Sequence, residues 1–403
     1  MRSLIIGDES SGADLVAELR SLGAEFEVYR PERPYAVDRR GEVPPVPKDL
    51  VDLCLRYRPE FIVPGAEHWV ALADIAAARY TANPNAPDRV FARRNKTGMA
   101  ATLREAGIRH PHTLEVRSAD GLARMLETLN YPVVVKPSAS GGSDMCSICP
   151  DALAAEAAVS KVLGTTNLLG QQNSGVTVQE YLDGPQLFVN TVSAHGEHTV
   201  TEVFKYVLDE DDGIPTIRAA YTLSAADPDA VAAVDYVLDC LDALGFGFGA
   251  SHTEVRMTTT GPNFVEFNGR MMGPCIPGEI YRGVRGYSQA SELARLLHTG
   301  ATACEKSGPR WSESLLGWYM LSADRPGRLV GLDYSTVLAL PGVLAVERRP
   351  EPGIDVTTDN RVTTGSMGMV FFTADSERRA LETVAALREI ECAGGIFTLA
   401  ELC

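Results

Sequence analysis

The stretch from Val133 to Ser143, VVVKPSASGGS, limits most strongly what this chain can fold into. Its three consecutive valines predict a buried β-strand, because β-branched side chains favour strands. The residues after Lys136 and Pro137 are all serine, alanine or glycine, so their backbone N–H groups can approach a phosphate without obstruction. A Walker A loop is excluded, since no Gly-Lys-Ser/Thr follows the glycines. The stretch therefore predicts either a phosphate-binding loop after a strand or an ordinary strand and turn.

The overall composition argues against several classes of function. A chain of 403 residues has room for about two or three domains. Its net charge of −16 disfavours nucleic acids and membrane surfaces as partners, because both are bound by basic patches. No apolar run approaches the ~20 residues of a membrane span, and the start of the chain has too short an apolar segment for a signal peptide. We therefore expect a cytoplasmic protein.

The first ninety residues predict a βαβ unit of the nucleotide-binding type, with strands at 3–7 and 25–29 around a helix. The glycines after the first strand lack the full G-x-G-x-x-G fingerprint, so NAD binding is disfavoured. A further strand, 61–63, ends in the sequence PGAEH, and ligands bind at the carboxyl ends of parallel strands. Glu67 is therefore a substrate-binding candidate, although it can equally cap the helix predicted at 67–79.

Residues 93–162 predict a small α+β unit around the glycine-rich loop. Its expected elements are a helix that opens with residues 93–96 and ends at Gly107, a strand at 112–116, a helix at 118–130 with Ser118 as N-cap, the strand of valines, a return strand at 144–149 and a helix at 150–162. Lys96 and Lys136 stand at the ends of two neighbouring elements of this unit. The loop therefore has two cations beside it.

Residues 177–193, TVQEYLDGPQLFVNTVS, predict two strands joined by a short turn. Such a connector between subdomains offers backbone groups to the edge of an adenine, and Gln186 offers a polar side chain to a ribose. Further strands are expected at 199–207 and 216–223. Lys205 and Arg218 on these strands are candidates for holding a substrate carboxylate.

The most informative strands are predicted at 250–257 and 264–268. Glu266 and Asn268 share one face of their strand, and across an antiparallel hairpin they can meet Glu254. Two carboxylates and an amide oxygen form a hard donor set suited to Mg²⁺ shared with phosphates. The alternative is a solvated sheet face, but the neighbouring valine and phenylalanines indicate burial, where carboxylates need cations. Arg270 follows directly and can meet an anionic group.

In this order, the motifs resemble those of the ATP-grasp enzymes over essentially the whole chain. The matching segments are RRNK with Lys96, YPVVVKPSASGGS with Lys136, VQEYLDGPQ and HTEVR…NFVEFNGRMMG. The resemblance implies an α/β and α+β fold with an N-terminal Rossmann-like (pre-ATP-grasp) domain at 1–92, an ATP-grasp domain at 93–310 and a C-terminal α+β domain at 311–403. Within the ATP-grasp domain it implies a small ATP-binding subdomain in 93–182 and a large subdomain in 183–310.

The resemblance also implies roles for individual residues. ATP would contact Lys96, Lys136, Ser138, Ser140, Gly141, Gly142, Ser143, Glu180, Tyr181, Leu182 and Gln186. The metal, Mg²⁺ with Mn²⁺ as an alternative, would lie on Glu254, Glu266 and Asn268. Arg270 and Lys136 would act in catalysis, with His252 either orienting substrate and metal ligands or serving a structural role, and Gly273 would be near the substrate. Gln186 departs from the family pattern, which often has Glu at the ribose.

Within the ATP-grasp enzymes, PGAEHWV, HTEVR and the late α+β domain look most similar to L-amino-acid ligases, which make dipeptides or amino-acid amides. The implied reaction forms an acyl phosphate from ATP and a carboxylate, then an amide from a small-molecule amine. One alternative is an ATP-grasp ligase or carboxylase that uses a small carboxylate or bicarbonate and a non-amino-acid acceptor. Another is a non-catalytic ATP-binding regulator, which the intact acidic set and Arg270 disfavour. A homodimer is left open.

Overall fold

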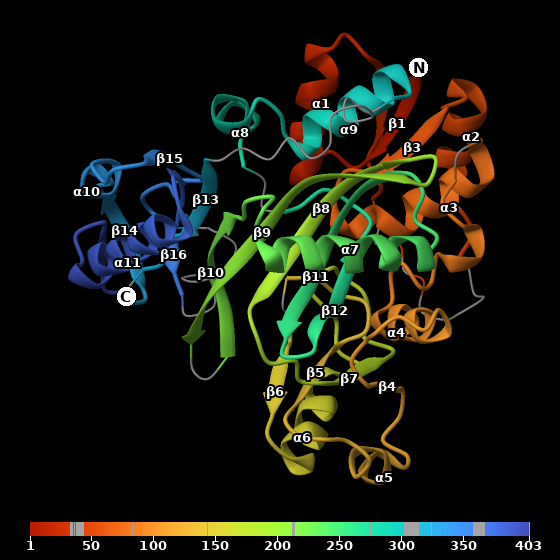
Figure 1. Ribbon diagram of the computed structural model, residues 1–403, viewed down its shortest axis with the longest axis horizontal. Coiled ribbons are helices and arrows are strands. Elements are labelled where there is room, and N and C mark those ends of the chain that lie inside the picture. The colour runs from red at the N-terminus through yellow and green to blue at the C-terminus, as the bar shows by residue number, and fades with distance from the viewer. Residues whose placement is uncertain are drawn as a thin grey trace. The chain divides into compact units, whose positions relative to one another are not determined.

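The computed structural model describes residues 1–32, 35, 37, 44–82, 84–142, 144–211, 214–273, 276–301, 314–323, 325–357 and 367–402. The chain divides into two compact units, whose elements are shown in Figure 1. The first unit comprises Met1–Thr201, Val231–Gly273 and Gln289–Pro309, and the second comprises Glu202–Ala230, Pro274–Ser288 and Arg310–Cys403. The domain boundaries expected after residues 92 and 310 stay predictions.

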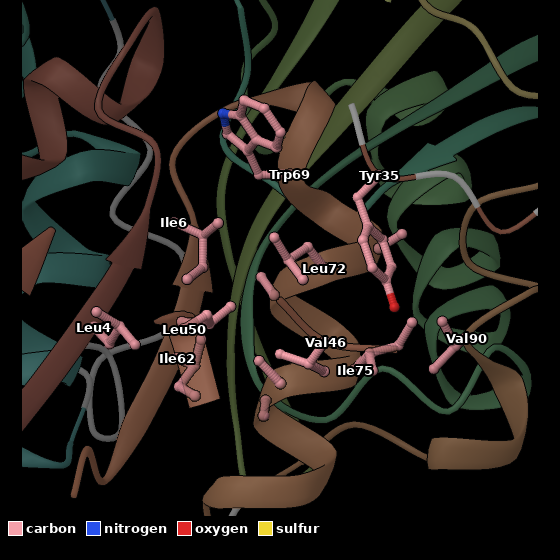
Figure 2. Packing of buried hydrophobic residues seen from close by; sticks show 14 of the residues in the cluster. Leu4, Ile6, Tyr35, Val46, Leu50, Ile62, Trp69, Leu72, Ile75 and Val90 are labelled. Atoms are coloured by element: carbon pink, nitrogen blue, oxygen red, sulfur yellow. The ribbon is translucent and has the colours of Figure 1, made fainter. Parts of the chain in front are cut away.

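The first unit begins with a parallel sheet of strand order β2-β1-β3. Its strands are β1 (Arg2–Ile6), β2 (Glu25–Tyr29) and β3 (Phe61–Pro64), with helices α1 (Ser11–Ser21), α2 (Lys48–Tyr57) and α3 (Val70–Tyr80). Figure 2 shows the buried cluster in which Leu4 and Ile6 of β1 lie with Leu72 and Ile75 of α3. These aliphatic side chains are hidden from water on one face of the sheet, which confirms the predicted βαβ start.

Two glycines bring the carboxyl ends of β1 and β3 together. A Cβ atom on Gly65 would lie 2.0 Å from the carbonyl oxygen of Gly7, so no larger residue fits without moving the backbone. The short 3₁₀ helix η1 (Glu67–Trp69) follows directly. Glu67 is therefore held at the carboxyl edge of the parallel sheet, where the sequence predicts ligand binding.

The glycine-rich loop belongs to an antiparallel sheet of order β4-β7-β5-β6. This region of the first unit contains η2 (Pro87–Arg89), α4 (Lys96–Glu105), β4 (Thr113–Val116), α5 (Leu122–Leu126), β5 (Val133–Pro137), β6 (Ser147–Cys149), α6 (Ala152–Val162) and β7 (Val176–Glu180). Val133 and Val135 are fully buried in one cluster with Val159 of α6. The strand of valines is therefore confirmed, and the return strand is shorter than the expected 144–149, because β6 begins only at Ser147.

The helix predicted at 118–130 is much shorter than expected. Gly121 has a φ of +72°, and α5 begins only after it. The Ser118 hydroxyl accepts a hydrogen bond from the backbone N–H of Asp120 at 3.3 Å, which makes a local turn. The prediction that Ser118 caps this helix is wrong, because the left-handed glycine interrupts the helical backbone between them.

The first unit also contains an antiparallel ladder of β8 (Gln186–Ala194), β11 (Gly249–Thr258) and β12 (Gly261–Asn268). Its register sets Glu254 opposite Glu266 and His252 opposite Asn268, as the predicted hairpin requires. Helix α9 (Gln289–Thr299) contributes Leu293 to a core that includes strands of this ladder. Helix α7 spans Pro228–Ala243.

The second unit contains a run of antiparallel strands in the order β10 (Ile214–Thr222), β13 (Leu315–Met320), β17 (Met369–Ala374) and β15 (Val343–Glu347). Strand β9 (Glu197–Asp211) pairs with β10, and β14 (Gly327–Leu332), β16 (Asp355–Val356) and β18 (Phe397–Ala400) form a small sheet. The helices are α8 (Gly278–Arg285), α10 (Ser335–Leu338) and α11 (Glu377–Ala393).

Every helix in the described part of the chain is too short or too polar to span a bilayer. The cytoplasmic location and the homodimer considered from the sequence stay predictions.

Candidate functional site

The glycine-rich loop is held in place by its own serines. The Ser138 and Thr177 hydroxyls lie 2.9 Å apart, and Ser138 is almost completely buried. Ser140 donates from its hydroxyl to Asp144 at 2.8 Å. Gly141 and Gly142 follow, and Gly142 has a φ of +68°, a conformation that glycine adopts without strain. The loop therefore keeps its backbone fixed, while Ser143 lies outside the described residues.

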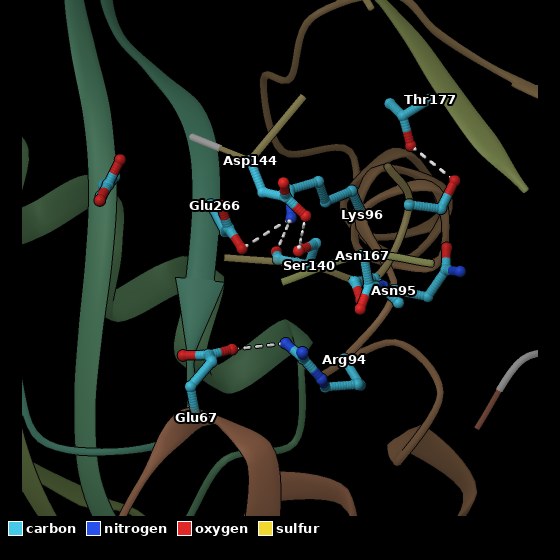
Figure 3. Close-up of polar contacts among 12 residues, drawn as sticks. Glu67, Arg94, Asn95, Lys96, Ser140, Asp144, Asn167, Thr177 and Glu266 are labelled. Atoms are coloured by element: carbon cyan, nitrogen blue, oxygen red, sulfur yellow. Dashed lines mark hydrogen bonds and ion pairs between the residues drawn. The ribbon is translucent and has the colours of Figure 1, made fainter. Parts of the chain in front are cut away.

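Lys96 links this loop to the acidic hairpin. Its Nζ donates to the carbonyl oxygen of Ser140 at 2.6 Å and lies 2.9 Å from Oε1 of Glu266 (Figure 3). The lysine is the first residue of α4, and Asn95 caps that helix by accepting from the backbone N–H groups of Thr97 and Gly98. The cap fixes where α4 begins and therefore where Lys96 points.

Lys136 differs from Lys96 in its partners. Within the described residues, its ammonium makes no hydrogen bond or ion pair. Burial, together with the positive charge of Lys96, lowers the pKa of Lys136, although Glu266 and Glu254 partly oppose this effect. A desolvated cation without a counter-ion gains most from an anionic ligand. The geometry around Lys136 is thus compatible with the phosphate contact expected from the sequence.

Glu254 is surrounded by hydrogen-bond donors. Gln186 donates from its amide to Oε2 of Glu254 at 2.8 Å, and Nε2 of His252 donates to Oε1 at 3.2 Å. Nδ1 of His252 lies 2.9 Å from the side-chain oxygen of Asn190. Burial opposes ionisation, but the hydrogen bond from His252 and the charge of Arg270 hold the pKa of Glu254 below its usual value. Burial also lowers the pKa of His252, despite its contact with Glu254.

These contacts bear on two expectations from the sequence. Gln186 contacts Glu254, so its expected contact with a ribose stays a prediction. His252 directly orients Glu254, which agrees with a positioning role for this histidine. Asn190 contacts His252 in this cluster but was not predicted from the sequence. Nothing in the pattern of β8 marks an asparagine among apolar residues as functional.

Glu67 accepts hydrogen bonds from two arginines. Arg270 donates from Nε to Oε2 at 2.6 Å, and Arg94 donates from Nη1 to Oε1. When its amide nitrogen faces Glu67, Asn268 donates to both carboxylate oxygens at 3.1 Å. Burial opposes ionisation, but Arg270 and Arg94 outweigh it and lower the pKa of Glu67 to about 2. Its side chain makes no cap hydrogen bond, because Ala66 is the N-cap of η1, so the alternative role as a helix cap is wrong.

The hairpin residues offer the donors that a hard divalent cation needs. Glu254 and Glu266 are cross-strand partners, and Asn268 keeps an amide oxygen on the side away from Glu67. Oxygen ligands of this kind suit Mg²⁺, so the donor chemistry fits the expected metal. No group of three His, Cys, Asp or Glu side chains gathers as a metal site in the described part of the chain, so a bound metal would need oxygen atoms from a substrate as well.

Two of the predicted substrate residues belong to the second unit. Lys205 and Arg218 lie in the second unit, where Lys205 pairs with Glu377 at 2.7 Å and Arg218 pairs with Glu391 at 2.6 Å. Both cations hold carboxylates, but these are carboxylates of α11. The substrate role expected for Lys205 and Arg218 therefore has no support from the geometry and stays a prediction.

The connector residues Glu180 and Tyr181 and the predicted substrate residue Gly273 all belong to the first unit. The backbone N–H of Glu180 donates to the carbonyl of His112 at 2.9 Å, and that of Tyr181 donates to Pro132 at 3.2 Å. The adenine contacts expected of these residues and of Leu182 stay predictions. A Cβ atom on Gly273 would lie 3.6 Å from the Ser10 hydroxyl, in the loop after β1.

Comparison with known proteins decides the fold. No protein-family model matches the chain. Dapdiamide A synthase of Enterobacter agglomerans is 27% identical over 340 residues, which cover 83% of this chain and 80% of that protein. The L-amino acid ligase of Bacillus licheniformis has a similar structure, with a TM-score of 0.76 and 18% identity over 100% of this chain and 99% of that one. This chain has the ATP-grasp fold.

The structure of this chain is also similar to that of a carboxylase domain. The biotin carboxylase domain of 2-oxoglutarate carboxylase from Hydrogenobacter thermophilus has a TM-score of 0.67 and 13% identity, over 99% of this chain and 90% of that chain. That structure holds MgADP, ADP and bicarbonate. The fold expected from the motifs is confirmed.

Proposed function

We propose that this ATP-grasp protein is an ATP- and Mg²⁺-dependent carboxylate–amine ligase. It activates an amino-acid carboxylate as an acyl phosphate and joins it to the amine of a second amino acid. The observation that carries this proposal is the cluster built around Lys96, which joins the phosphate-type loop to Glu266 of the acidic hairpin. Lys96 thus links the loop to one carboxylate of the hairpin within the first unit, which supports a phosphate and metal site between them.

Different residues of this site would bind different parts of ATP. Backbone N–H groups of 138–142 would receive the β- and γ-phosphates, with Lys96 and Lys136 balancing their charge. Residues 180–182 would border the adenine. Glu254, Glu266 and Asn268 would hold Mg²⁺, which when bound would neutralise charge on the phosphates.

The reaction then proceeds in two displacements. An oxygen of the substrate carboxylate attacks the γ-phosphorus, the bond to the bridging oxygen of ADP breaks, and an acyl phosphate forms. The amine attacks the acyl carbon, loses a proton, and expels phosphate with the former carboxylate oxygen. Arg270 would stabilise charge that develops on the acyl phosphate, and Glu67 holds Arg270 in place. No nucleophilic side chain is needed, because positioning and charge stabilisation carry phosphoryl transfer.

The name of one similar structure, L-amino acid ligase, supports amino acids as the substrates. Dapdiamide A synthase also matches most of this chain, and its name is that of a synthase. The carboxylase with bound bicarbonate shows that the same fold also serves a small inorganic acid, so it defines the competing function. A regulator without activity is disfavoured, since Glu254, Glu266, Asn268 and Arg270 are grouped with two lysines beside the loop.

Phosphate release tests this function. The protein is incubated with ATP, Mg²⁺ and the twenty standard amino acids, singly and in pairs, and products are weighed by mass spectrometry. We expect release that requires two amino acids and a product lighter than their sum by one water. Release with bicarbonate alone, or with one acid and no amine, would instead support the carboxylase-type alternative.

A further inference from the structure

Arg94, which lies two residues before Lys96 in the first unit, is a buried arginine with an unused donor. Its side chain is 5% exposed, and its Nη1 atom donates to Oε1 of Glu67 (Figure 3). Its Nη2 atom is also buried and has no hydrogen-bond partner in the described part of the chain. Buried polar atoms normally have partners, so this nitrogen needs an explanation.

The neighbouring Arg93 provides a comparison, because its nitrogens are all used within the fold. Its Nε donates to Asp74 at 2.7 Å. Its Nη1 donates to the carbonyl oxygen of Leu244 and its Nη2 to that of Ala86, both at 2.9 Å. Arg93 is therefore explained by its structural contacts alone, whereas Arg94 has one nitrogen for which the described residues supply no acceptor.

The charges around Glu67 indicate that the missing acceptor is an anion. Glu67 accepts from Arg94 at Oε1 and from Arg270 at Oε2, so one carboxylate serves two guanidinium groups. A buried cation without a full counter-ion is stabilised when a ligand supplies negative charge. Hydrogen bonds from arginine to an anionic oxygen are also stronger than those between neutral groups. Nη2 of Arg94 is therefore a suitable donor to an anionic oxygen of a ligand.

The position of Glu67 indicates which anion is bound. Glu67 follows β3 directly at the carboxyl edge of the parallel sheet, and the glycine-rich loop lies against it, since a Cβ atom on Gly141 would be 3.4 Å from Cγ of Glu67. A ligand oxygen on Arg94 would therefore lie beside the loop that would hold the phosphates. The negative charge of Glu67 repels a phosphate more strongly than a singly charged carboxylate, which favours the carboxylate at this position.

We propose that Nη2 of Arg94 binds one oxygen of the substrate carboxylate that attacks ATP. This inference rests on the proposed ligase function and adds the residue that orients the nucleophile. The second carboxylate oxygen keeps its lone pairs and forms the bond to the γ-phosphorus. The bond between that phosphorus and the bridging oxygen breaks, and its electron pair leaves with ADP. Arg94 thus holds the acid on the side of Glu67 while the loop holds the phosphoryl group.

Arg94→Lys separates this role from the ion pair with Glu67. A lysine has one nitrogen, which can keep the contact with Oε1 of Glu67 but cannot also supply the second donor. The KM for the acid found by the substrate panel should therefore rise by about 10- to 100-fold, the range expected for a lost hydrogen bond to a charged group. The KM for ATP should be unchanged. Hydroxylamine, which traps an acyl phosphate as a hydroxamate, allows both values to be measured without the amine substrate.

Two further variants separate substrate binding from stability. Arg94→Met removes both contacts, so it should raise the KM for the acid at least as much and should also unfold at a lower urea concentration. Arg94→Lys should unfold close to the wild-type midpoint, because it keeps a counter-ion for Glu67. Arg104→Met removes an exposed arginine of α4 and should leave both KM values and the unfolding midpoint unchanged.

Several outcomes would overturn the proposal. A wild-type KM for the acid in Arg94→Lys would contradict it, and a raised KM for ATP with an unchanged KM for the acid would assign Arg94 to the phosphates instead. A lowered unfolding midpoint with both KM values unchanged would show a purely structural role. These results differ from a failure of the ligase function, in which the wild type itself would form neither hydroxamate nor amide with any acid. That last result would also overturn the carboxylate assigned to Arg94.

Discussion

Replacing Glu266 with glutamine is expected to abolish ADP formation while leaving the chain folded. Glu266 lies opposite Glu254 in the hairpin and also pairs with Lys96 at 2.9 Å. The amide keeps the shape of the side chain but removes the charge that would hold Mg²⁺ and orient Lys96. Because charge stabilisation is the main catalytic contribution in phosphoryl transfer, we expect a loss of at least about 10³-fold in kcat.

A coupled assay for ADP measures this effect at saturating ATP and Mg²⁺. Glu197→Gln provides the matched control, because Glu197 is an exposed carboxylate at the start of β9 and should be replaceable without loss. Circular dichroism should give the same spectrum for both variants and the wild type. Full activity in Glu266→Gln would rule out this carboxylate as a metal ligand.

Replacing Glu67 with glutamine is expected to give the largest loss of stability. The carboxylate of Glu67 compensates Arg94 and Arg270 in a nearly closed environment, since its side chain is 12% exposed. A neutral amide leaves both guanidinium groups without their counter-ion. Removing one partner of a buried ion pair costs about 3–5 kcal/mol in the free energy of unfolding. The kcat for ADP formation should fall as well, because Arg270 loses the carboxylate that orients it.

Comparing the wild type with Glu67→Gln at different pH values tests the same ion pairs. The pKa of Glu67 is about 2 in the folded chain, below its ordinary value of 4.5. The carboxylate therefore contributes its full stabilisation above pH 4.5, and this contribution is lost as the pH falls from 4.5 towards 2. Urea unfolding at a series of pH values should show a difference between wild type and Glu67→Gln that shrinks across this window. A difference that is small at pH 7, or independent of pH, would contradict the role assigned to Glu67.

Local sequence patterns were sufficient to predict the parts of the site that lie on single elements. The valines before Lys136 predict the strand, and the small residues after it predict the loop. The spacing of Glu254, Glu266 and Asn268 predicts their shared face, because a strand alternates its side chains with period two. These features depend on neighbours close in the chain, so the sequence alone is enough.

Contacts between distant segments were not predictable in this way. Arg94 was not singled out, although it stands in the RRNK motif, because its partner Glu67 lies 27 residues earlier in another element. Lys205 and Arg218 have the right chemistry for a substrate carboxylate, but α11 brings Glu377 and Glu391 to them from 172 and 173 residues away. Only the three-dimensional structure shows which anion satisfies a given cation.

The central claim is that the carboxylate itself attacks ATP, and an oxygen label tests it most directly. The acid substrate is prepared with ¹⁸O in its carboxylate and supplied with ATP, Mg²⁺ and the amine, and the released phosphate is analysed by mass spectrometry. An acyl phosphate intermediate predicts that each phosphate carries one oxygen atom from the carboxylate. Phosphate without the label would mean that water attacks ATP, and it would contradict the ligase mechanism.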